Sequence, residues 1–262
     1  MLHKAFSSVV GELKSSGKKI ANGLGIDVRN RKFYHVDPFR DQLTLLQGLQ
    51  VATIVDGGAN VGDISARYRL LFPNANIYAF EPGELPAQHF SERFAADSAV
   101  KLLKVGLSDE IGHATFNVGE ASVLSSLLPS APGAERYMGA EAHRSHPEQI
   151  PTVTLDHFAA EHGLNRIDIL KLDIQGAEGK ALRGADSLLR SNSIRLVYSE
   201  VLFGSLYDGQ AYFHDLSKSL HECGYQLYGL YNLVQGTDGT LSYGDAIFMN
   251  RELASSLPPR AR

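Results

Sequence analysis

The sequence predicts an α/β protein with a mostly parallel sheet and helices on both of its faces. From residue 51 onward, short apolar runs typical of strands alternate with amphipathic stretches typical of helices. One run, at residues 166–172, is almost continuously apolar, as expected of a strand buried on both faces. A length of 262 residues fits one such domain with extensions better than two domains.

The first half of the sheet is expected from residues 51–118. Each apolar run there is followed by a helical stretch, until regular alternation ends after the third strand. The expected strands are 51–58, 74–82 and 101–109, with an extra strand at 113–118, and the expected helices are 60–72 and 85–96.

Residues 119–151 interrupt the alternation with a segment rich in Ser, Pro, Gly and His. A connection of this length in a compact domain is usually functional or disordered, and we interpret it as a lid or substrate loop. His143 and His146 are candidate acid–base residues or a metal pair, although a solvated loop histidine is the simpler alternative. The serines of this segment are candidates for ligand contact, namely Ser122, Ser125 and Ser126.

The second half of the sheet is expected from residues 153–250. The turn-forming TDGT sequence at 237–240 separates two strand-like runs and predicts an antiparallel hairpin at the sheet edge. The expected strand–helix unit is 153–163, the strands are 166–178, 193–203, 225–234 and 242–250, and the helix is 211–224.

Charge is distributed unevenly along the chain. The net charge is −4, which argues against a nucleic-acid partner. Residues 1–35 carry seven basic and two acidic side chains, so a basic helical arm is expected at 1–45. This arm is interpreted as a solvated helix face, with weak contact to a membrane surface as the alternative. The predicted domain is 46–252, and a tail is expected at 253–262.

Neither a membrane span nor a disulfide framework is expected. No apolar run approaches the ~20 residues that cross a bilayer. Cys223 is the only cysteine, and we interpret it as a packing residue. Because no secretory signal is recognisable, the chain is predicted to be cytoplasmic.

The turn after the first strand, IVDGGANVG, predicts a ligand site at the carboxyl end of the sheet. Gly57, Gly58 and Gly62 permit a sharp turn and close approach of a ligand, and Asn60 tolerates a left-handed conformation. A nicotinamide dinucleotide is the alternative ligand, but its pyrophosphate favours glycines spaced as GxGxxG, which this turn lacks. Asp56 opens the turn and suits a ligand with a cationic amino group instead.

S-adenosylmethionine meets these requirements, because it carries an amino group and no phosphate. Glu81, followed by Pro82 at the end of the second strand, is placed to accept hydrogen bonds from the ribose hydroxyls. The third strand then supplies the adenine wall. The candidates there are Leu107, Ser108 and Asp109, although SDEIG is also ordinary turn chemistry.

Five motifs in this order resemble the FkbM family of S-adenosylmethionine-dependent methyltransferases. They are VDGGANVGDIS, YAFEP, GLSDEIG, ILKLDIQGAE and YSEV, and the resemblance covers roughly residues 51–250. It implies the Rossmann-like class I methyltransferase fold, with a seven-stranded, mostly parallel sheet and an antiparallel edge strand. It also implies O-methylation of a hydroxyl in a sugar, glycolipid or other natural product.

One departure concerns the chemistry. Where the family often has a glutamate in its fourth-strand motif, this chain has Gln175, which cannot act as a base. Any role of that glutamate falls to Asp173 or Glu178, or is absent. The candidate catalytic residues are Asp173, at the end of the fourth strand, Glu200, near the end of the fifth, and Glu178, at the start of the next helix. One of these carboxylates is expected to accept the proton of the acceptor hydroxyl; Mg²⁺ bound by them is an alternative, and no metal is assigned.

Two other functions remain open from the sequence. One is an NAD-dependent oxidoreductase with the same class of fold. The other is a non-catalytic, methyltransferase-like binding module. The expected partner is a small-molecule or glycan hydroxyl acceptor, and the sequence gives no oligomeric state.

Overall fold

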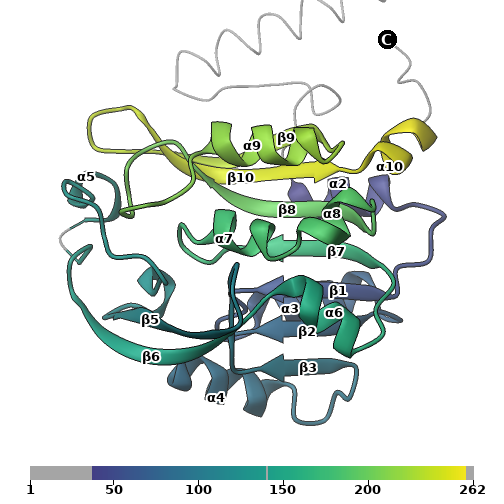
Figure 1. Ribbon diagram of the computed structural model, residues 1–262, viewed down its shortest axis with the longest axis horizontal. Coiled ribbons are helices and arrows are strands. Elements are labelled where there is room, and N and C mark those ends of the chain that lie inside the picture. The colour runs from purple at the N-terminus through teal and green to yellow at the C-terminus, as the bar shows by residue number, and fades with distance from the viewer. Residues whose placement is uncertain (1–36, 140, 258–262) are drawn as a thin grey trace, which may run out of the picture. The chain divides into compact units, whose positions relative to one another are not determined.

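The computed structural model describes residues 37–139 and 141–257. Within these residues, the strands form a seven-stranded sheet in the order β3-β2-β1-β7-β8-β10-β9 (Figure 1). Its strands are β1 (Thr53–Gly57), β2 (Asn76–Phe80), β3 (Val100–Leu103), β7 (Ile167–Leu172), β8 (Ile194–Leu202), β9 (Gln226–Gln235) and β10 (Leu241–Met249).

The direction of the strands agrees with the predicted topology. The pairs β1–β2, β2–β3, β1–β7 and β7–β8 are parallel. The strand β10 is antiparallel to both of its neighbours, β8 and β9, so an antiparallel hairpin forms the edge of the sheet. The class I methyltransferase fold expected from the sequence is therefore confirmed.

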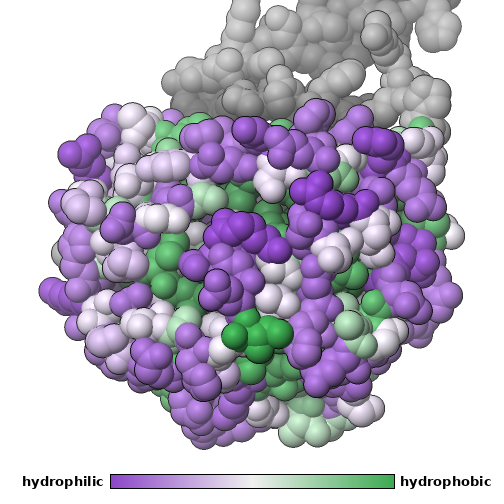
Figure 2. Space-filling view, viewed as in Figure 1, coloured by the Kyte–Doolittle hydropathy of each residue, from purple (hydrophilic) through white to green (hydrophobic). Residues whose placement is uncertain are grey.

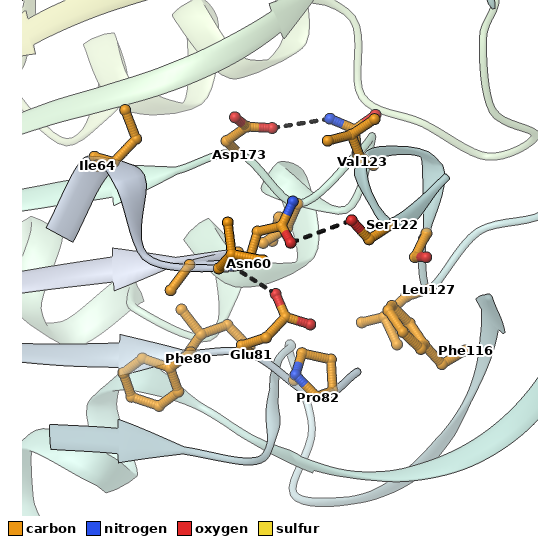
Figure 3. Close-up of a pocket in the computed structure, with 18 of the residues that line it drawn as sticks. Asn60, Ile64, Phe80, Glu81, Pro82, Phe116, Ser122, Val123, Leu127 and Asp173 are labelled. Carbon is orange, nitrogen blue, oxygen red and sulfur yellow. Dashed lines mark hydrogen bonds between the residues drawn. The ribbon is translucent and has the colours of Figure 1, made fainter. Parts of the chain in front are cut away.

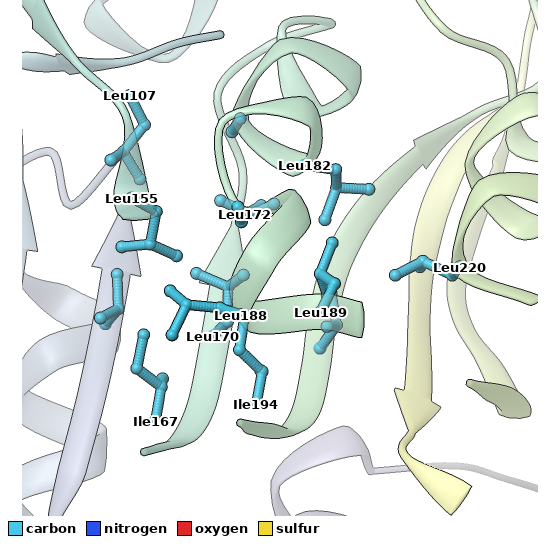
Figure 4. Packing of buried hydrophobic residues seen from close by; sticks show 14 of the residues in the cluster. Leu107, Leu155, Ile167, Leu170, Leu172, Leu182, Leu188, Leu189, Ile194 and Leu220 are labelled. Carbon is cyan, nitrogen blue, oxygen red and sulfur yellow. The ribbon is translucent and has the colours of Figure 1, made fainter. Parts of the chain in front are cut away.

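Alternating strand residues divide the core between the two faces of this sheet. Val55 and Leu170 pack on the face covered by α6 (Leu155–Glu161), α7 (Glu178–Arg183), α8 (Asp186–Arg190) and α9 (Phe213–Glu222). Figure 4 shows the leucines that dominate this side. The adjacent residues Ile54 and Ile169 face α2 (Pro38–Leu45), α3 (Asp63–Leu71) and α4 (Glu84–Arg93). Cys223 is buried in the first of these cores, consistent with packing.

The strand expected at 101–109 does not continue through that range. After Leu103 the chain leaves the main sheet, and β4 (Gly106–Leu107) pairs with Thr152 and Val153 of β6. This strand, β6 (Ser145–Val153), also pairs antiparallel with β5 (Gly112–Gly119), giving a separate sheet in the order β4-β6-β5. The extra strand expected at 113–118 is thus present as β5.

The segment 119–151 is more ordered than the predicted loop. Its end forms most of β6, and it also contains η1 (Ser122–Leu124) and α5 (Glu135–Met138). The ring of Tyr137 lies between Gly204 and Gly236, where a Cβ at either glycine would lie 2.7 Å from ring atoms. The physical reason for the difference is that strand pairing and this aromatic contact are long-range, so local polarity gave no sign of them.

The two expected boundaries also differ from the structure. Residues 37–45 belong to the same compact unit as residue 46 onward, because Phe39 and Leu45 of α2 are buried against the second core. Likewise α10 (Arg251–Ser256) buries Leu253 there. The rest of the predicted basic arm (1–36) and the end of the predicted tail (258–262) lie outside the described residues.

The surface of the described part is mainly polar. In the view of Figure 2, apolar residues reach the surface in small groups separated by polar ones. Among the described residues, no helix is both long enough and apolar enough to cross a membrane.

Candidate active site

A pocket opens where the carboxyl ends of β1, β2 and β7 meet (Figure 3). Its cavity volume is about 200 Å³. Gly58 and Asn60 line it after β1, Glu81 and Pro82 after β2, and Asp173 after β7. Strand ends of a parallel sheet meet at one edge, which is why residues so distant in sequence share this wall.

The glycine turn has the backbone conformation that its sequence predicts. Gly58 has φ +73°, and a Cβ there would lie 1.9 Å from the carbonyl oxygen of Asp173. Asn60 has φ +46°, and Gly62, at φ +88°, begins α3 against the rings of Phe90 and Phe94. The turn therefore packs directly on the end of β7 and leaves its outer side free for a ligand.

Asp56 does not reach the pocket. Its side chain is fully buried under the turn, where Oδ1 lies 3.0 Å from Lys171 Nζ and Oδ2 accepts a 2.6 Å hydrogen bond from Ser65. Lys171 Nζ also donates to the carbonyls of Gly57 and Gly58. The amino group that Asp56 meets thus belongs to the protein itself, and this corrects the expected contact between Asp56 and a ligand.

Lys171 keeps its charge in this buried position. Burial alone lowers the pKa of a lysine, but Asp56 and Asp173 outweigh it and raise the pKa of Lys171 above its usual value. The ammonium group therefore donates hydrogen bonds to two carbonyls of the glycine turn, and the carboxylate of Asp56 balances its charge. A lysine inside the apolar strand ILKL is an unusual feature of the sequence, and it is the signal by which this residue could have been found.

Glu81 lies at the pocket wall with 7% of its surface exposed. Its two carboxylate oxygens accept the backbone N–H groups of Asn60 at 2.9 Å and Gly83 at 2.8 Å. Burial raises the pKa of Glu81, against the lowering effect of these two hydrogen bonds. Each oxygen has a second lone pair, so the side chain can still accept from a ligand hydroxyl.

Of the three residues proposed for the adenine wall, only Leu107 lines the pocket. Asp109 instead lies 2.8 Å from Arg183 and 3.3 Å from Lys180, and Ser108 donates to it. Burial raises the pKa of Asp109, but these partners overcome it and hold the value at about 2. Asp109 therefore forms ion pairs with α7 in place of the predicted contact with adenine. No local sequence pattern predicted these ion pairs.

The opposite wall is formed by β5 and the segment that follows it, and most of its residues were not predicted from the sequence. Phe116, Val123 and Leu127 add apolar surface to the pocket. The hydroxyl of Ser122 donates to Asn60 Oδ1 at 3.2 Å, which joins η1 to the glycine turn. Ser126 donates to the carbonyl of Gln175 at 2.5 Å. Ser122 and Ser125 line the pocket, whereas Ser126 does not, and their contact with a ligand stays a prediction.

Asp173 and Glu200 come together through one side chain. Gln175 Nε2 donates to Asp173 Oδ1 at 2.8 Å and to Glu200 Oε2 at 3.3 Å. Asp173 and Gln175 line the pocket, whereas Glu200 lies behind them on β8. Burial, with the nearby charges of Asp173 and Glu178, raises the pKa of Glu200 well above its usual value.

Glu178 is turned away from the pocket. It is 1% exposed and accepts the backbone N–H of Ile174 at 2.7 Å, so it closes the loop between β7 and α7. Burial is the main cause that raises its pKa to about 7, and Asp173 adds to the effect. Its location fits a structural carboxylate better than direct contact with an acceptor.

The remaining candidates show no metal arrangement. His143 lies 3.2 Å from Glu135, and His146 lies 3.1 Å from Glu148, both exposed. Within residues 37–139 and 141–257, no three His, Cys, Asp or Glu side chains are grouped to hold a metal ion.

A mostly parallel seven-stranded sheet of this order, with its antiparallel edge strands, a glycine turn after β1 and an acid after β2, is the fold of the class I methyltransferases. More narrowly, the chain belongs to the methyltransferase FkbM domain family, whose model matches residues 56–227.

Three named relatives illustrate this membership. The chain is 28% identical to 2-O-methyltransferase NoeI of Sinorhizobium fredii over 164 residues, which cover 60% of this chain and 66% of that protein. It is 31% identical to methyltransferase sdnD of Sordaria araneosa over 155 residues, which cover 51% of this chain and 60% of that protein. It is 25% identical to 31-O-demethyl-FK506 methyltransferase FkbM of Streptomyces tacrolimicus over 205 residues, which cover 69% of this chain and 77% of that protein. The chain thus spans less than two thirds of the first two relatives.

Proposed function

We propose that the protein transfers the methyl group of S-adenosylmethionine to a hydroxyl group of a small-molecule or glycan acceptor. The observation that carries this proposal is the meeting of Asn60, Glu81 and Asp173 in one pocket at the carboxyl edge of the sheet. Two relatives support an oxygen acceptor by their names, a 2-O-methyltransferase and a 31-O-demethyl-FK506 methyltransferase.

The residues of the pocket fit this cofactor. Gly58 lets the turn pack on the backbone of Asp173, which brings the turn and the end of β7 into one pocket wall, and Glu81 retains acceptor capacity for ribose hydroxyls. The side chains of Phe80 and Phe116 both line the pocket and offer apolar surface to an adenine ring. Lys171 also lines the pocket, but its ammonium group donates to backbone carbonyls. It is therefore poorly placed to neutralise the pyrophosphate of a nicotinamide dinucleotide.

The chain's own residues handle the acceptor and its proton. Bound S-adenosylmethionine would supply an electrophilic methyl carbon on a sulfonium. A neutral alcohol is a weak nucleophile, so a base must accept its proton as the new C–O bond would form and the C–S bond of the sulfonium would break, leaving a thioether. We assign this role to Asp173, because it lines the pocket. Glu200 is the second choice, since it reaches the pocket only through Gln175, and Glu178 is the third.

A ligand-binding experiment tests the cofactor. S-adenosylmethionine, S-adenosylhomocysteine and NAD⁺ are each added to the purified protein, and the melting temperature is measured. We expect the first two to raise it and NAD⁺ to leave it unchanged. Stabilisation by NAD⁺ alone would favour the oxidoreductase alternative and end the methyltransferase proposal.

A turnover experiment tests the reaction. Formation of S-adenosylhomocysteine is measured with a panel of glycans, glycolipids and polyketides. We expect Asp173→Asn to lower turnover by about 10²–10⁴-fold, as for loss of a general base, while cofactor binding persists. Asp186→Asn, on the exposed side of α8, serves as the matched control. Binding of the cofactor without turnover of any acceptor would favour the non-catalytic module.

The remaining expectations about partners stay predictions. A cytoplasmic location, the absence of a nucleic-acid partner and a weak contact of the basic arm with membranes belong to this group. The arm lies largely outside the described residues, and fractionation of cells with an antibody against the protein would test its location.

A further inference from the structure

Gln175 joins three polar side chains beside the pocket. Its Nε2 donates to Asp173 and Glu200, and its Oε1 accepts a 2.6 Å hydrogen bond from the hydroxyl of Tyr207. The amide is therefore at the centre of a network that starts on the loop after β7, crosses to β8 and ends on the segment after β8.

The chemistry of these partners determines how the amide is oriented. The NH₂ group of the amide faces Asp173 Oδ1 and Glu200 Oε2, because a carboxylate oxygen accepts hydrogen bonds and the NH₂ group donates them. The carbonyl then faces Tyr207, whose hydroxyl can donate. The reverse orientation would place a carbonyl oxygen against carboxylate oxygens and lose both hydrogen bonds.

The backbone around Gln175 is built to hold this network. Gln175 has φ +55°, a left-handed conformation that costs free energy for a residue with a Cβ. Its carbonyl is fixed by Ser126. At the next position, Gly176 has φ +90°, and a Cβ there would lie 2.7 Å from the ring of Tyr207. The ring can approach the amide only because position 176 has no side chain.

We propose that Gln175 is a positioning residue whose amide holds Asp173 and Glu200 beside each other as a pair of hydrogen-bond acceptors, with Tyr207 locking the amide in place. The catalytic meaning of this pair rests on the proposed function. The amide neither gains nor loses a proton near neutral pH, so it aligns the carboxylates without competing with them for the proton of the acceptor.

Removing the donor should alter the proton affinity of Glu200. The charged and titratable groups that face Glu200 are Lys171, Asp173, Glu178, Tyr207, Tyr243 and Asp245. The three acids, Asp173, Glu178 and Asp245, disfavour its charged form, whereas Lys171 and the neutral donor of Gln175 favour it. A methionine at position 175 removes the donor, and a glutamate replaces it with a further negative charge.

The experiment measures the titration of Glu200 directly. Protein labelled with ¹³C in its glutamate carboxyl groups is titrated by NMR, and Glu200→Gln identifies the signal. We expect the midpoint of Glu200 to rise by about one pH unit or more in Gln175→Met and further in Gln175→Glu. Both variants keep an unbranched side chain of similar length, so the backbone at φ +55° is equally strained. An unchanged midpoint in both variants overturns the proposal.

Two further variants complete the experiment. Tyr207→Phe removes only the hydroxyl that locks the amide, and we expect a smaller rise of the same midpoint. If the position-175 variants do not fold, absence of a rise in Tyr207→Phe overturns the proposal. Gln88→Met is the matched control, because Gln88 is exposed on α4 and donates to Glu92 instead.

Binding of S-adenosylhomocysteine is measured on the same samples. Failure of the wild-type protein to bind it counts against the proposed function, whereas binding with an unmoved Glu200 midpoint counts against this inference alone. Once an acceptor is found, the acid limb of the pH–rate profile should move toward higher pH in Gln175→Glu.

Discussion

Lys171 Nζ lies 3.0 Å from Asp56 Oδ1 in the interior of the sheet, directly beneath the glycine turn. The side chain of Asp56 is fully buried and that of Lys171 is 4% exposed. Because Lys171 also donates to the carbonyls of Gly57 and Gly58, this ion pair links the sheet interior to the wall of the pocket. A change at Lys171 is therefore expected to affect both the sheet interior and the glycine turn that lines the pocket.

Lys171→Met should destabilise the protein strongly. The change leaves Asp56 as a buried charge with Ser65 as a remaining partner, which costs about 3–5 kcal/mol in comparable buried pairs. The free energy of unfolding in urea measures the loss. The double variant Asp56→Asn with Lys171→Met removes the unpaired charge and should recover a large part of it. If the double variant is no more stable than the single one, the pair is not the cause.

Gly58→Ala should disrupt the turn as well as the pocket. A Cβ at Gly58 would overlap the carbonyl oxygen of Asp173, so the loss of stability should exceed the ~1 kcal/mol of an unfavourable φ angle. Gly163→Ala is the matched control, because Gly163 also has positive φ but has no neighbour within 4 Å of its Cβ position. Equal melting temperatures of the two variants would show that the overlap is relieved at no cost.

Glu81→Gln should weaken binding of S-adenosylhomocysteine. In the glutamine variant, an NH₂ group replaces one carboxylate oxygen and faces a backbone N–H, so the hydrogen bond from Asn60 or from Gly83 is lost. The same change removes one acceptor for the ribose hydroxyls. A loss of about 1.5–3 kcal/mol corresponds to roughly 10–100-fold in Kd, measured by titration calorimetry. Glu84→Gln is the control, because Glu84 is exposed and pairs with Lys104. A Kd equal to that of the wild type would remove Glu81 from the cofactor site.

Stability should fall as pH rises through the neutral range, and Glu178 should account for part of the fall. Its pKa rises from the usual 4.5 to about 7 in the folded state, so the native state retains a proton that the unfolded state has released. Its contribution is complete below about pH 4.5 and is lost as pH passes 7, a change of up to ~3 kcal/mol. The raised pKa of Glu200 acts in the same direction.

Glu178→Gln should therefore flatten this dependence. Urea unfolding at about pH 5 and about pH 8 gives the comparison, because the difference between the two values reports the protons bound on folding. Glu92→Gln, exposed on α4, should leave the slope as it is in the wild type. A slope that persists in Glu178→Gln would assign the pH dependence to other groups.

The sequence alone determined the parts of this protein that depend on local pattern. The alternation of apolar runs and helical stretches predicted a mostly parallel sheet with helices on both faces, and the resemblance to the FkbM family implied its seven strands. The glycine turn with Glu81 predicted the cofactor class. Gly58, Asn60, Glu81, Pro82, Leu107 and Asp173 were also placed at the edge where the pocket lies. These features follow from periodicity and from backbone conformations that few residues adopt, and both are readable along the chain.

The tertiary structure decided which charges face one another. Asp56 and Asp109 are polar residues beside the turn and the third strand, yet each is paired with a basic side chain more than seventy positions away. The pairing of β5 with β6, which turns the segment after residue 119 into a wall of the pocket, is equally non-local. A charged side chain that leaves water pairs with an opposite charge that folding brings within about 4 Å. Which residue that is depends on how the sheet and its connections pack, and not on spacing in the sequence.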